Sequence, residues 1–197
     1  MKMISLKIDG FRGDKQIEFF PSEKISVITG SNGSGKTNII KMLWAILSGN
    51  IIIALREIPF SSATLTTTEY KCKVIRTGKL DCIVEYNKKN KPPEIFRDNS
   101  FEDSDGDIIT LETAEDQAAS VITKEGSSLF FPTFRRIEGG FGINYGNKSP
   151  FYSAGDSSEI DEAFSGISKR LTKGNHQFIT SISAQDVSNM SQKLFLE

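Results

Sequence analysis

The segment from Ile25 to Leu47 constrains the fold of this chain more than any other. A short run rich in β-branched residues, Ile25–Thr29, leads directly into Gly30–Thr37, which reads Gly-Ser-Asn-Gly-Ser-Gly-Lys-Thr. The following residues, Asn38–Leu47, place apolar side chains at helical spacing, and Gly49 can end such a helix. The pattern predicts a buried central strand, a glycine-rich loop and a helix with one apolar face.

The glycine-rich loop has the spacing Gly-x-x-x-x-Gly-Lys-Thr, which is that of a phosphate loop. Its glycines lack a Cβ atom, so backbone N–H groups can approach phosphate oxygens, and the helix after it adds the positive end of its dipole. Lys36 can reach the β- and γ-phosphates, and the Thr37 hydroxyl can complete the coordination of Mg²⁺. A turn that binds nothing would need neither side chain. We therefore predict that ATP and Mg²⁺ bind here. The predicted contacts are Gly30, Ser31, Asn32, Gly33, Ser34, Gly35, Lys36, Thr37 and Asn38.

Two short strands are predicted before the loop. Met3–Ile8 alternates polar and apolar residues, Gly10–Asp14 is a turn, and Gln16–Phe19 should return antiparallel to the first strand.

A β-hairpin is predicted over Thr64–Tyr86, with Arg76-Thr77-Gly78 as its loop. That register places Cys72 and Cys82 directly across from each other on one buried face, as reduced thiols. The same face would carry Tyr70, Val74, Leu80 and Val84, and the other face Lys71, Lys73, Asp81 and Glu85.

The rest of the chain gives weaker patterns. Asn87–Asp107 is polar and predicts a surface loop, and Gly139–Ser158 predicts a lid, a partner loop or a disordered insertion. The remaining predictions are a helix over Leu111–Thr123, a strand over Ser128–Phe131, a helix through Ile160–Leu171 capped by Ser157 or Ser158, a strand over Gln177–Ile182 and a helix start over Ala184–Leu196.

Composition excludes several classes of protein. The chain of 197 residues has a net charge of −1, so its overall charge favours no polyanionic partner, although a local basic surface remains open. Two cysteines and one histidine, His176, are too few for a disulfide scaffold or a zinc site of the Cys/His type. No apolar run reaches the roughly 20 residues that a membrane span needs, and the N-terminus lacks a signal peptide's apolar core. We predict a cytoplasmic protein with no membrane partner.

The N-terminal residues resemble a known family. Met-Ile-Ser-Leu-Lys-Ile-Asp-Gly-Phe-Arg-Gly, an antiparallel strand and then Ile-Thr-Gly-Ser-Asn-Gly-Ser-Gly-Lys-Thr-Asn-Ile-Ile are similar to ABC-type ATPases of the SMC, RecF and OLD group. The similarity extends to OLD-type nucleases and to ATPase subunits of phage-defence systems such as Septu and retrons. It covers residues 1–48 and, less closely, the hairpin. The implied fold is α/β, a P-loop NTPase of the ABC-head type whose N-terminal lobe has an antiparallel β-subdomain and a helical extension.

The resemblance implies further site residues and partners. In that family the Phe-Arg segment lies beside the nucleotide, which implies nucleotide contacts for Phe11 and Arg12. A strand followed by Pro-x-x-Arg, found in many small defence ATPases, matches Pro132 and the residues after it, so Arg135 or Arg136 could contact phosphate, nucleic acid or a partner carboxylate. The family also implies two heads that dimerise on ATP and control nucleic-acid handling or an antiphage effector protein.

The family's C-terminal signature, Walker B strand and switch histidine cannot be identified in this sequence. The chain ends within an amphipathic segment. These observations predict the N-terminal half of a head, divided into a lobe over residues 1–138, a loop over 139–158 and a segment over 159–197. Two other functions remain open. One is a P-loop kinase of a small substrate, which the strand pair before the loop disfavours. The other is a module that binds ATP without hydrolysis to hold an assembly together.

Overall fold

The computed structural model describes residues 1–22, 24–102, 108–131 and 166–179. The chain divides into two units, Met1–Ser128 and Leu129–Glu197. The first contains the glycine-rich loop. The predicted domain limits at 138 and 158 lie outside the described residues.

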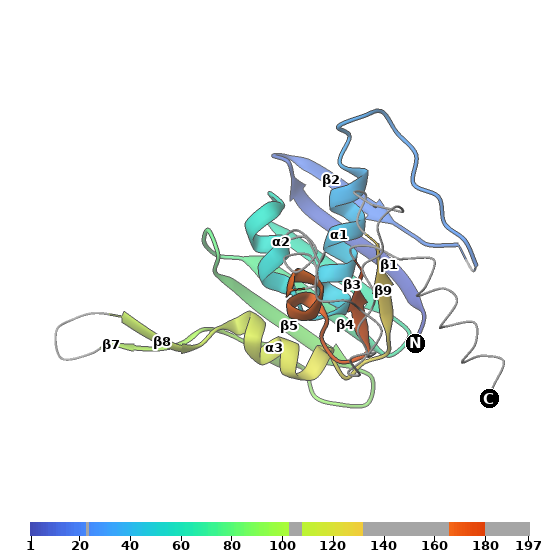
Figure 1. Ribbon diagram of the computed structural model, residues 1–197. Helices are drawn as coiled ribbons and strands as arrows, with labels where there is room; N and C mark the ends of the chain where they lie inside the picture. The colour runs from blue at the N-terminus through green and yellow to red at the C-terminus, as the bar shows by residue number, and fades with distance from the viewer. Residues whose placement is uncertain (23, 103–107, 132–165, 180–197) are drawn as a thin grey trace, which may run out of the picture. The chain divides into compact units, whose positions relative to one another are not determined.

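The first unit is built on a six-stranded antiparallel sheet (Figure 1). Its strands follow the order β2-β1-β3-β4-β5-β6, so the two N-terminal strands pair at one edge and the rest form a meander. The strands are β1 (Met3–Phe11), β2 (Lys15–Phe19), β3 (Ser62–Thr67), β4 (Tyr70–Arg76), β5 (Cys82–Lys88) and β6 (Glu94–Phe96). The predicted antiparallel pairing of the first two strands is confirmed.

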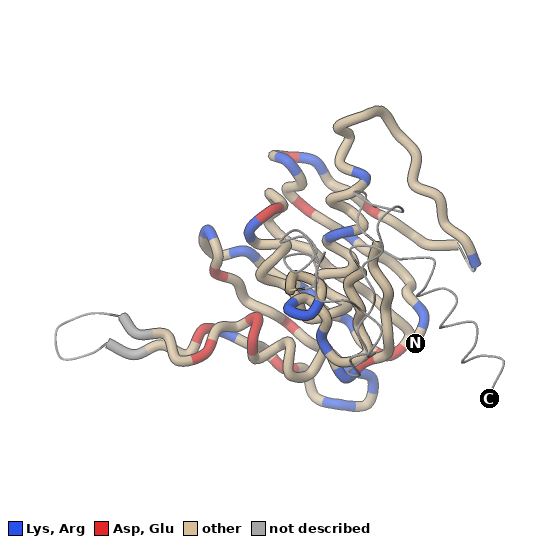
Figure 2. Tube along the Cα trace, viewed as in Figure 1, with Lys and Arg blue, Asp and Glu red and all other residues tan. Residues whose placement is uncertain are grey.

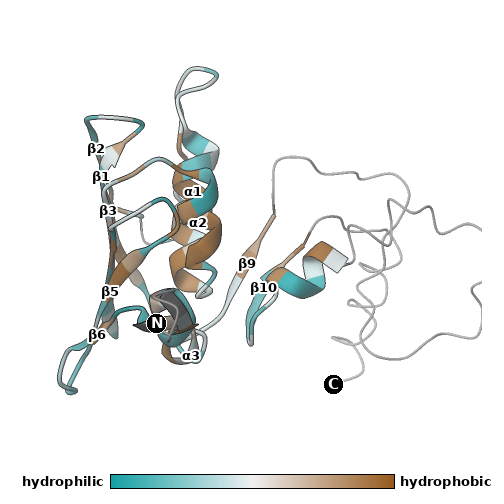
Figure 3. Ribbon diagram, turned by 90° about the vertical axis from the view of Figure 1, so that its left-hand side faces the viewer, coloured by the Kyte–Doolittle hydropathy of each residue, from teal (hydrophilic) through white to brown (hydrophobic). Residues whose placement is uncertain are grey.

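Period-two alternation gives the sheet one apolar face and one polar face. Leu6 and Ile8 of β1, Leu65 of β3 and Val84 of β5 are fully buried on the apolar face. Three helices cover this face: α1 (Lys36–Leu47), α2 (Ile51–Glu57) and α3 (Ala114–Ile122). Figure 3 shows all three on the same side of the sheet. The hydrophobic core of the unit therefore lies between one sheet face and one helical layer.

The helix after the loop is confirmed, and so is its end. Met42, Ala45 and Ile46 of α1 are fully buried against the sheet. The chain leaves the helix at Gly49, whose φ is +66°, and a Cβ there would meet the Cα of Ala119 in α3 at 3.0 Å. Glycine is thus required both by the backbone conformation and by the close approach of another helix. The helix α2 was not predicted from the sequence.

The predicted buried strand over Ile25–Thr29 is wrong for the described structure. These residues form no strand, and the side chains of Ile25 and Val27 are each 77% exposed. The Ser22 N–H donates to the Ser26 hydroxyl at 2.7 Å, which bends the chain just before the run. Within the described residues no neighbouring strand offers hydrogen bonds to this segment, and β propensity alone cannot make a strand without one.

The hairpin prediction is partly wrong. Thr64–Tyr86 contains parts of two hairpins, because β3 ends at Thr67 and the chain reverses before Tyr70. In the second hairpin Cys72 pairs with Tyr86 and Arg76 pairs with Cys82, so the two cysteines share the buried face but are not opposite each other. The connecting turn is longer than predicted, which moves Leu80 out of the buried row to 39% exposure. The shift in register is even, so the side chains within β4 and β5 stay on their predicted faces, whereas Leu80 lies in the turn.

Several later segments also differ from expectation. The predicted loop over 87–107 contains β6 and β7 (Asn99–Glu102), and β7 pairs with β8 (Ile108–Glu112) in a ribbon that projects from the sheet (Figure 1). The predicted helix over 111–123 begins only at Ala114, because the Thr113 side chain accepts a hydrogen bond from the Asp116 N–H and caps it. Strand pairing of residues 108–112 therefore prevails over helical periodicity there.

The second unit is described only in part. β9 (Ser128–Phe130) pairs with β10 (His176–Phe178), which confirms short strands at both predicted places. His176 is buried in β10, as expected for a strand residue, and residues 166–171 are helical. Outside the described residues lie Arg135, Arg136, the 139–158 segment, Ser157, Ser158 and the segment predicted as a helix start at 184–196. Across the described parts of both units, no helix has the length and apolar character needed to cross a membrane.

The two buried cysteines allow a test of the packing of β4 and β5 against the helices. Both thiols are reduced, and burial is the first cause that raises the pKa of each to about 12. At pH 8 the two thiols of the folded protein should therefore react with a thiol reagent only as fast as the protein unfolds. In denatured protein both thiols should react at once. Unfolded thiols lose their protons from about pH 9, so their contribution to the free energy of unfolding should fall as the pH rises from 9 toward 12.

A Thr77→Cys variant supplies the control, because residue 77 lies in the exposed β4–β5 turn. It should add one rapidly reacting thiol to the folded protein. Immediate labelling of Cys72 and Cys82 in the folded wild type would contradict the burial of these thiols.

Candidate nucleotide site

The glycine-rich loop ends where α1 begins, so the first amides of the helix face the loop. Gly35 is the N-cap residue with a φ of +97°, and its carbonyl accepts the first helical hydrogen bond from the Ile39 N–H at 3.0 Å. The amides before residue 39 have no partner within the helix, and they lie at the positive end of its dipole. The local structure therefore provides an anion site at the start of a helix of 12 residues.

Gly35 and Gly33 are glycines for different reasons. Gly35 is buried, and a Cβ there would lie 2.7 and 2.8 Å from two ring carbons of Phe11. Gly33 is exposed, has a φ of +76°, and a Cβ there would meet nothing within 4 Å. The first is required by packing as well as by backbone conformation, and the second by conformation alone.

Phe11 and Arg12 lie directly against the loop. Phe11 ends β1, is 1% exposed, and covers Gly35. Arg12 has a φ of +52°, and its Nη1 donates to the Gly33 carbonyl. The Arg12 guanidinium also lies 5.9 Å from the centre of the Phe11 ring. The structure thus brings this turn and the glycine-rich loop together, although contact of either side chain with a nucleotide stays a prediction.

The Lys36 ammonium group is folded onto the loop. Its Nζ donates to the Gly30 carbonyl at 2.7 Å and to the Ser31 carbonyl at 2.8 Å, and the side chain is half-buried. The amine is therefore held by the loop backbone. An expectation that Lys36 faces solvent when no nucleotide is bound is wrong for this structure. Lys36 can exchange these carbonyl partners for phosphate oxygens.

The metal prediction rests on Thr37. This residue is exposed at the first turn of α1, and its hydroxyl has no hydrogen-bond partner among the described residues, so it fits a role as a Mg²⁺ ligand. In that same part of the chain no group of three Asp, Glu, His or Cys side chains could hold a metal. Any Mg²⁺ bound there would depend on Thr37 and on phosphate oxygens.

Arg76 holds a segment that supports the site, and this role was not predicted from the sequence. We predicted it as part of a hairpin loop. Instead its Nε donates to the Phe60 carbonyl at 3.0 Å, and its Nη2 donates to the Leu55 and Ile58 carbonyls at 2.8 and 3.0 Å. The guanidinium also lies 4.6 Å from the centre of the Phe60 ring. Arg76 thereby fixes the connector between α2 and β3.

That connector in turn supports the turn beside the loop. The Arg12 N–H donates to the Pro59 carbonyl at 3.1 Å, and the Ser61 N–H donates to the Asp9 carbonyl at 2.8 Å. The Asp9 carboxylate accepts from the Ser62 hydroxyl at 3.0 Å. No local sequence pattern could have revealed this arrangement, because its partners are about 50 residues apart along the chain.

Comparison with known proteins agrees with this geometry. Residues 1–195 match the family described as the AAA ATPase domain. The chain belongs to this family. Its glycine-rich loop, antiparallel sheet and covering helices fit an α/β P-loop NTPase, and nucleotide binding is the property that the family shares.

Shorter matches narrow the class. The chain is similar to the "DNA replication and repair protein RecF" of Anaeromyxobacter sp. (41% identity over 44 residues, 22% of this chain and 12% of the relative). The RecF proteins of Prosthecochloris aestuarii (46% over 43 residues, 22% and 12%) and Shewanella oneidensis (43% over 49 residues, 25% and 14%) match similarly. The matched part spans only about an eighth of these relatives. The resemblance to SMC/RecF-type ATPases is thus confirmed.

Gly33 and Gly35 of the loop provide a matched pair of variants. Gly33→Ala and Gly35→Ala both place a Cβ on a left-handed backbone, at a cost of about 1–2 kcal/mol each. Only Gly35→Ala also collides with Phe11, so it should lower the free energy of unfolding clearly more than Gly33→Ala does. Denaturant unfolding without nucleotide measures both. Equal losses would show that Phe11 does not pack on Gly35.

Proposed function

We propose that this chain binds ATP with Mg²⁺ at Gly30–Thr37 as part of an SMC/RecF-like ATPase head. The observation that carries the proposal is the convergence of four elements: the first amides of α1, which have no partner within the helix, Lys36 bound to the loop carbonyls, Thr37 at the helix start, and the Phe11–Arg12 turn against the loop. The match to an ATPase family over nearly the whole chain supports the same reading.

Each residue has a distinct task in the proposed site. The amides at the start of α1 and Lys36 hold the phosphates, with Lys36 leaving the Gly30 and Ser31 carbonyls to do so. Thr37 is a ligand of Mg²⁺, which when bound neutralises part of the phosphate charge. Arg12 releases the Gly33 carbonyl and turns to the nucleotide, while Phe11 keeps the loop in place.

The proposal extends to what the ATP site controls. In an ABC-type arrangement, two heads would bind ATP between them, and association of the heads would regulate the handling of DNA in the cytoplasm. RecF, a DNA replication and repair protein, supports a nucleic-acid role. An antiphage effector, as in OLD, Septu or retron systems, is the other output we propose, with Arg135 or Arg136 available for a partner. The β1–β2 pair before the loop favours this class over a small-molecule kinase.

A lysine substitution tests nucleotide binding. Lys36→Ala removes a charge-assisted contact to phosphate, which should cost about 1.5–3 kcal/mol, or roughly ten-fold or more in ATP affinity. Isothermal titration calorimetry with Mg²⁺ and ATP measures the loss. Lys41→Ala is the matched control, because Lys41 lies on the same helix but pairs with Glu57. Unchanged affinity in Lys36→Ala with normal folding by circular dichroism would exclude the assignment.

Hydrolysis provides a separate test. The described site holds phosphates, but in the described residues and in the sequence no catalytic carboxylate can be assigned to orient water. Residues 1–197 should therefore bind ATP and release phosphate no faster than the Lys36→Ala variant. Phosphate release is measured with that variant as background, across a range of protein concentrations to detect activation by dimerisation. Turnover near 1 s⁻¹ or above, roughly the lower end of ordinary enzymes, would show that this chain contains its own catalytic group.

A further inference from the structure

The sheet face opposite α1, α2 and α3 carries a row of polar side chains, one on each of four neighbouring strands. Register places Ser5 of β1 beside Thr66 of β3, Thr66 beside Lys71 of β4, and Lys71 beside Asn87 of β5. Each follows or precedes a buried residue of the helix-covered face, so alternation places all four on the opposite face, and they are at least partly exposed. None of these side chains has a hydrogen-bond or ionic partner among the described residues. The row therefore presents hydroxyl, ammonium and amide donors to solvent and no carboxylate.

The neighbouring row shows that this is not a general property of the face. One step along the strands, Lys7 pairs with Glu18 at 3.4 Å and Lys73 pairs with Glu85 at 3.9 Å. Those charges are neutralised within the sheet, so they leave little net potential. The donor row (Ser5, Thr66, Lys71 and Asn87) differs because its positive charge is unmatched.

Two further lysines flank the end of the donor row. Lys89 and Lys91 lie in the exposed β5–β6 turn, visible as a blue segment in Figure 2. The Lys89 N–H donates to the Glu69 carbonyl at 2.9 Å, which ties this turn to the β3–β4 turn, and the Lys91 N–H donates to the Lys88 carbonyl at 3.0 Å. The lysines thus stand on a braced turn, and neither ammonium group is paired within the described residues.

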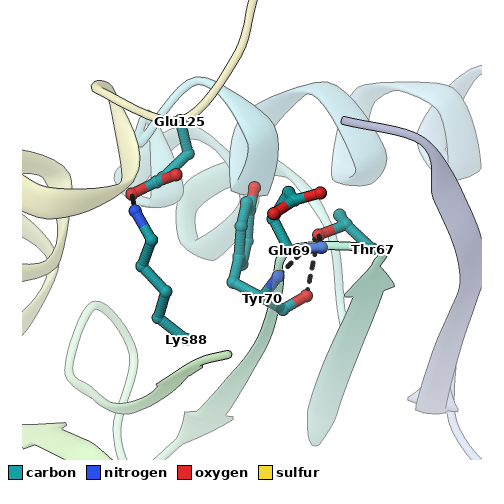
Figure 4. Close-up of polar contacts among 5 residues, drawn as sticks. All are labelled: Thr67, Glu69, Tyr70, Lys88 and Glu125. Carbon is teal, nitrogen blue, oxygen red and sulfur yellow. Dashed lines mark hydrogen bonds and ion pairs between the residues drawn. The ribbon is translucent and has the colours of Figure 1, made fainter. Parts of the chain in front are cut away.

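Two other charged groups, Lys88 and Glu69, lie at this end. Lys88 points to the helical side and forms an ion pair with Glu125 (Figure 4). The β3–β4 turn contributes Glu69, whose carboxylate accepts from the Thr68 hydroxyl at 3.2 Å. In the same turn the Thr67 hydroxyl is bound to the backbone of Tyr70 at 2.8 and 2.9 Å. These hydrogen bonds brace both turns. A hydroxyl does not neutralise a carboxylate, so Glu69 keeps its negative charge, and the three lysines Lys71, Lys89 and Lys91 against the one carboxylate of Glu69 leave a net charge of +2.

We propose that the donor row, together with Lys89 and Lys91, is a docking surface for the backbone of duplex DNA. Strands lie about 4.8 Å apart, so four strands present donors over roughly 14 Å, a length along which one DNA strand carries about four phosphates. Ammonium, hydroxyl and amide donors are the groups that contact phosphates. The row has no aromatic side chain, which disfavours both a protein interface and base stacking of single strands.

The docking surface is separate from the nucleotide site. Ser5 lies near the start of β1 and Phe11 at its end, which corresponds to roughly 20 Å along the strand. The surface gives the DNA role proposed above a location, and it rests on that role only for the choice of DNA over another polyanion. It requires no base-specific contact, so sequence should have little influence on affinity.

A salt titration with charge variants tests the proposal. The probe is a fluorescein-labelled mixed-sequence duplex, and the protein is the full 197-residue chain. Removal of three phosphate contacts in Lys71→Gln/Lys89→Gln/Lys91→Gln should reduce the slope of log K against log salt by roughly 2.7. Between 50 and 200 mM salt, wild type should therefore lose roughly 40-fold more affinity than the triple variant does. Scrambling the duplex sequence should change neither value.

Three controls make each outcome decisive. Lys79→Gln removes an exposed lysine from the opposite end of the β4–β5 hairpin and should leave the slope nearly unchanged. The triple variant should keep the circular-dichroism spectrum of the folded protein, and it should also keep ATP affinity, so this proposal and the ATP proposal can fail independently. An equal effect of Lys79→Gln, no duplex binding at low salt, or lysine-dependent binding of polyglutamate but not duplex would overturn the proposal.

Discussion

The contact between Phe11 and Gly35 joins the sheet to the glycine-rich loop, and the geometry of the site depends on it. The ring occupies the space that a side chain at residue 35 would need, so the end of β1 and the start of α1 meet without a gap. Arg12 follows Phe11 immediately and reaches the loop carbonyl of Gly33. Because the position of Arg12 is also fixed through Pro59, a long-range network around Arg76 determines where the loop stands relative to the sheet.

The parts of this arrangement that sequence predicted are the local ones. Glycine spacing, Lys36 and the apolar pattern of Asn38–Leu47 depend on neighbouring residues, and they identified the loop and the helix correctly. The β1–β2 pair followed from alternation with a short turn. Placement of Phe11 and Arg12 beside the loop came from a family resemblance, because nothing in their own spacing indicates it.

The parts that sequence could not predict depend on partners far along the chain. Arg76 resembles an ordinary turn residue until the carbonyls of Leu55 and Ile58 are brought to it by the fold. Ile25–Thr29 has the composition of a buried strand, but composition specifies only a preference, and a strand forms where another backbone lies beside it. The β4–β5 turn was misjudged because a three-residue and a longer loop preserve the same alternation, so the hydrophobic pattern cannot distinguish them.

The hydrogen bonds of Lys36 and Arg12 to loop carbonyls have a consequence for selectivity. Both cations already have partners at the loop, so an incoming anion exchanges contacts and does not simply fill a vacant site. An anion too short to reach both cations can replace only some of the hydrogen bonds that Lys36 and Arg12 give up. A chain of linked phosphates can engage both at once, and the second engagement is intramolecular. In the site proposed above, the loop would therefore favour polyphosphates over inorganic phosphate and other small anions.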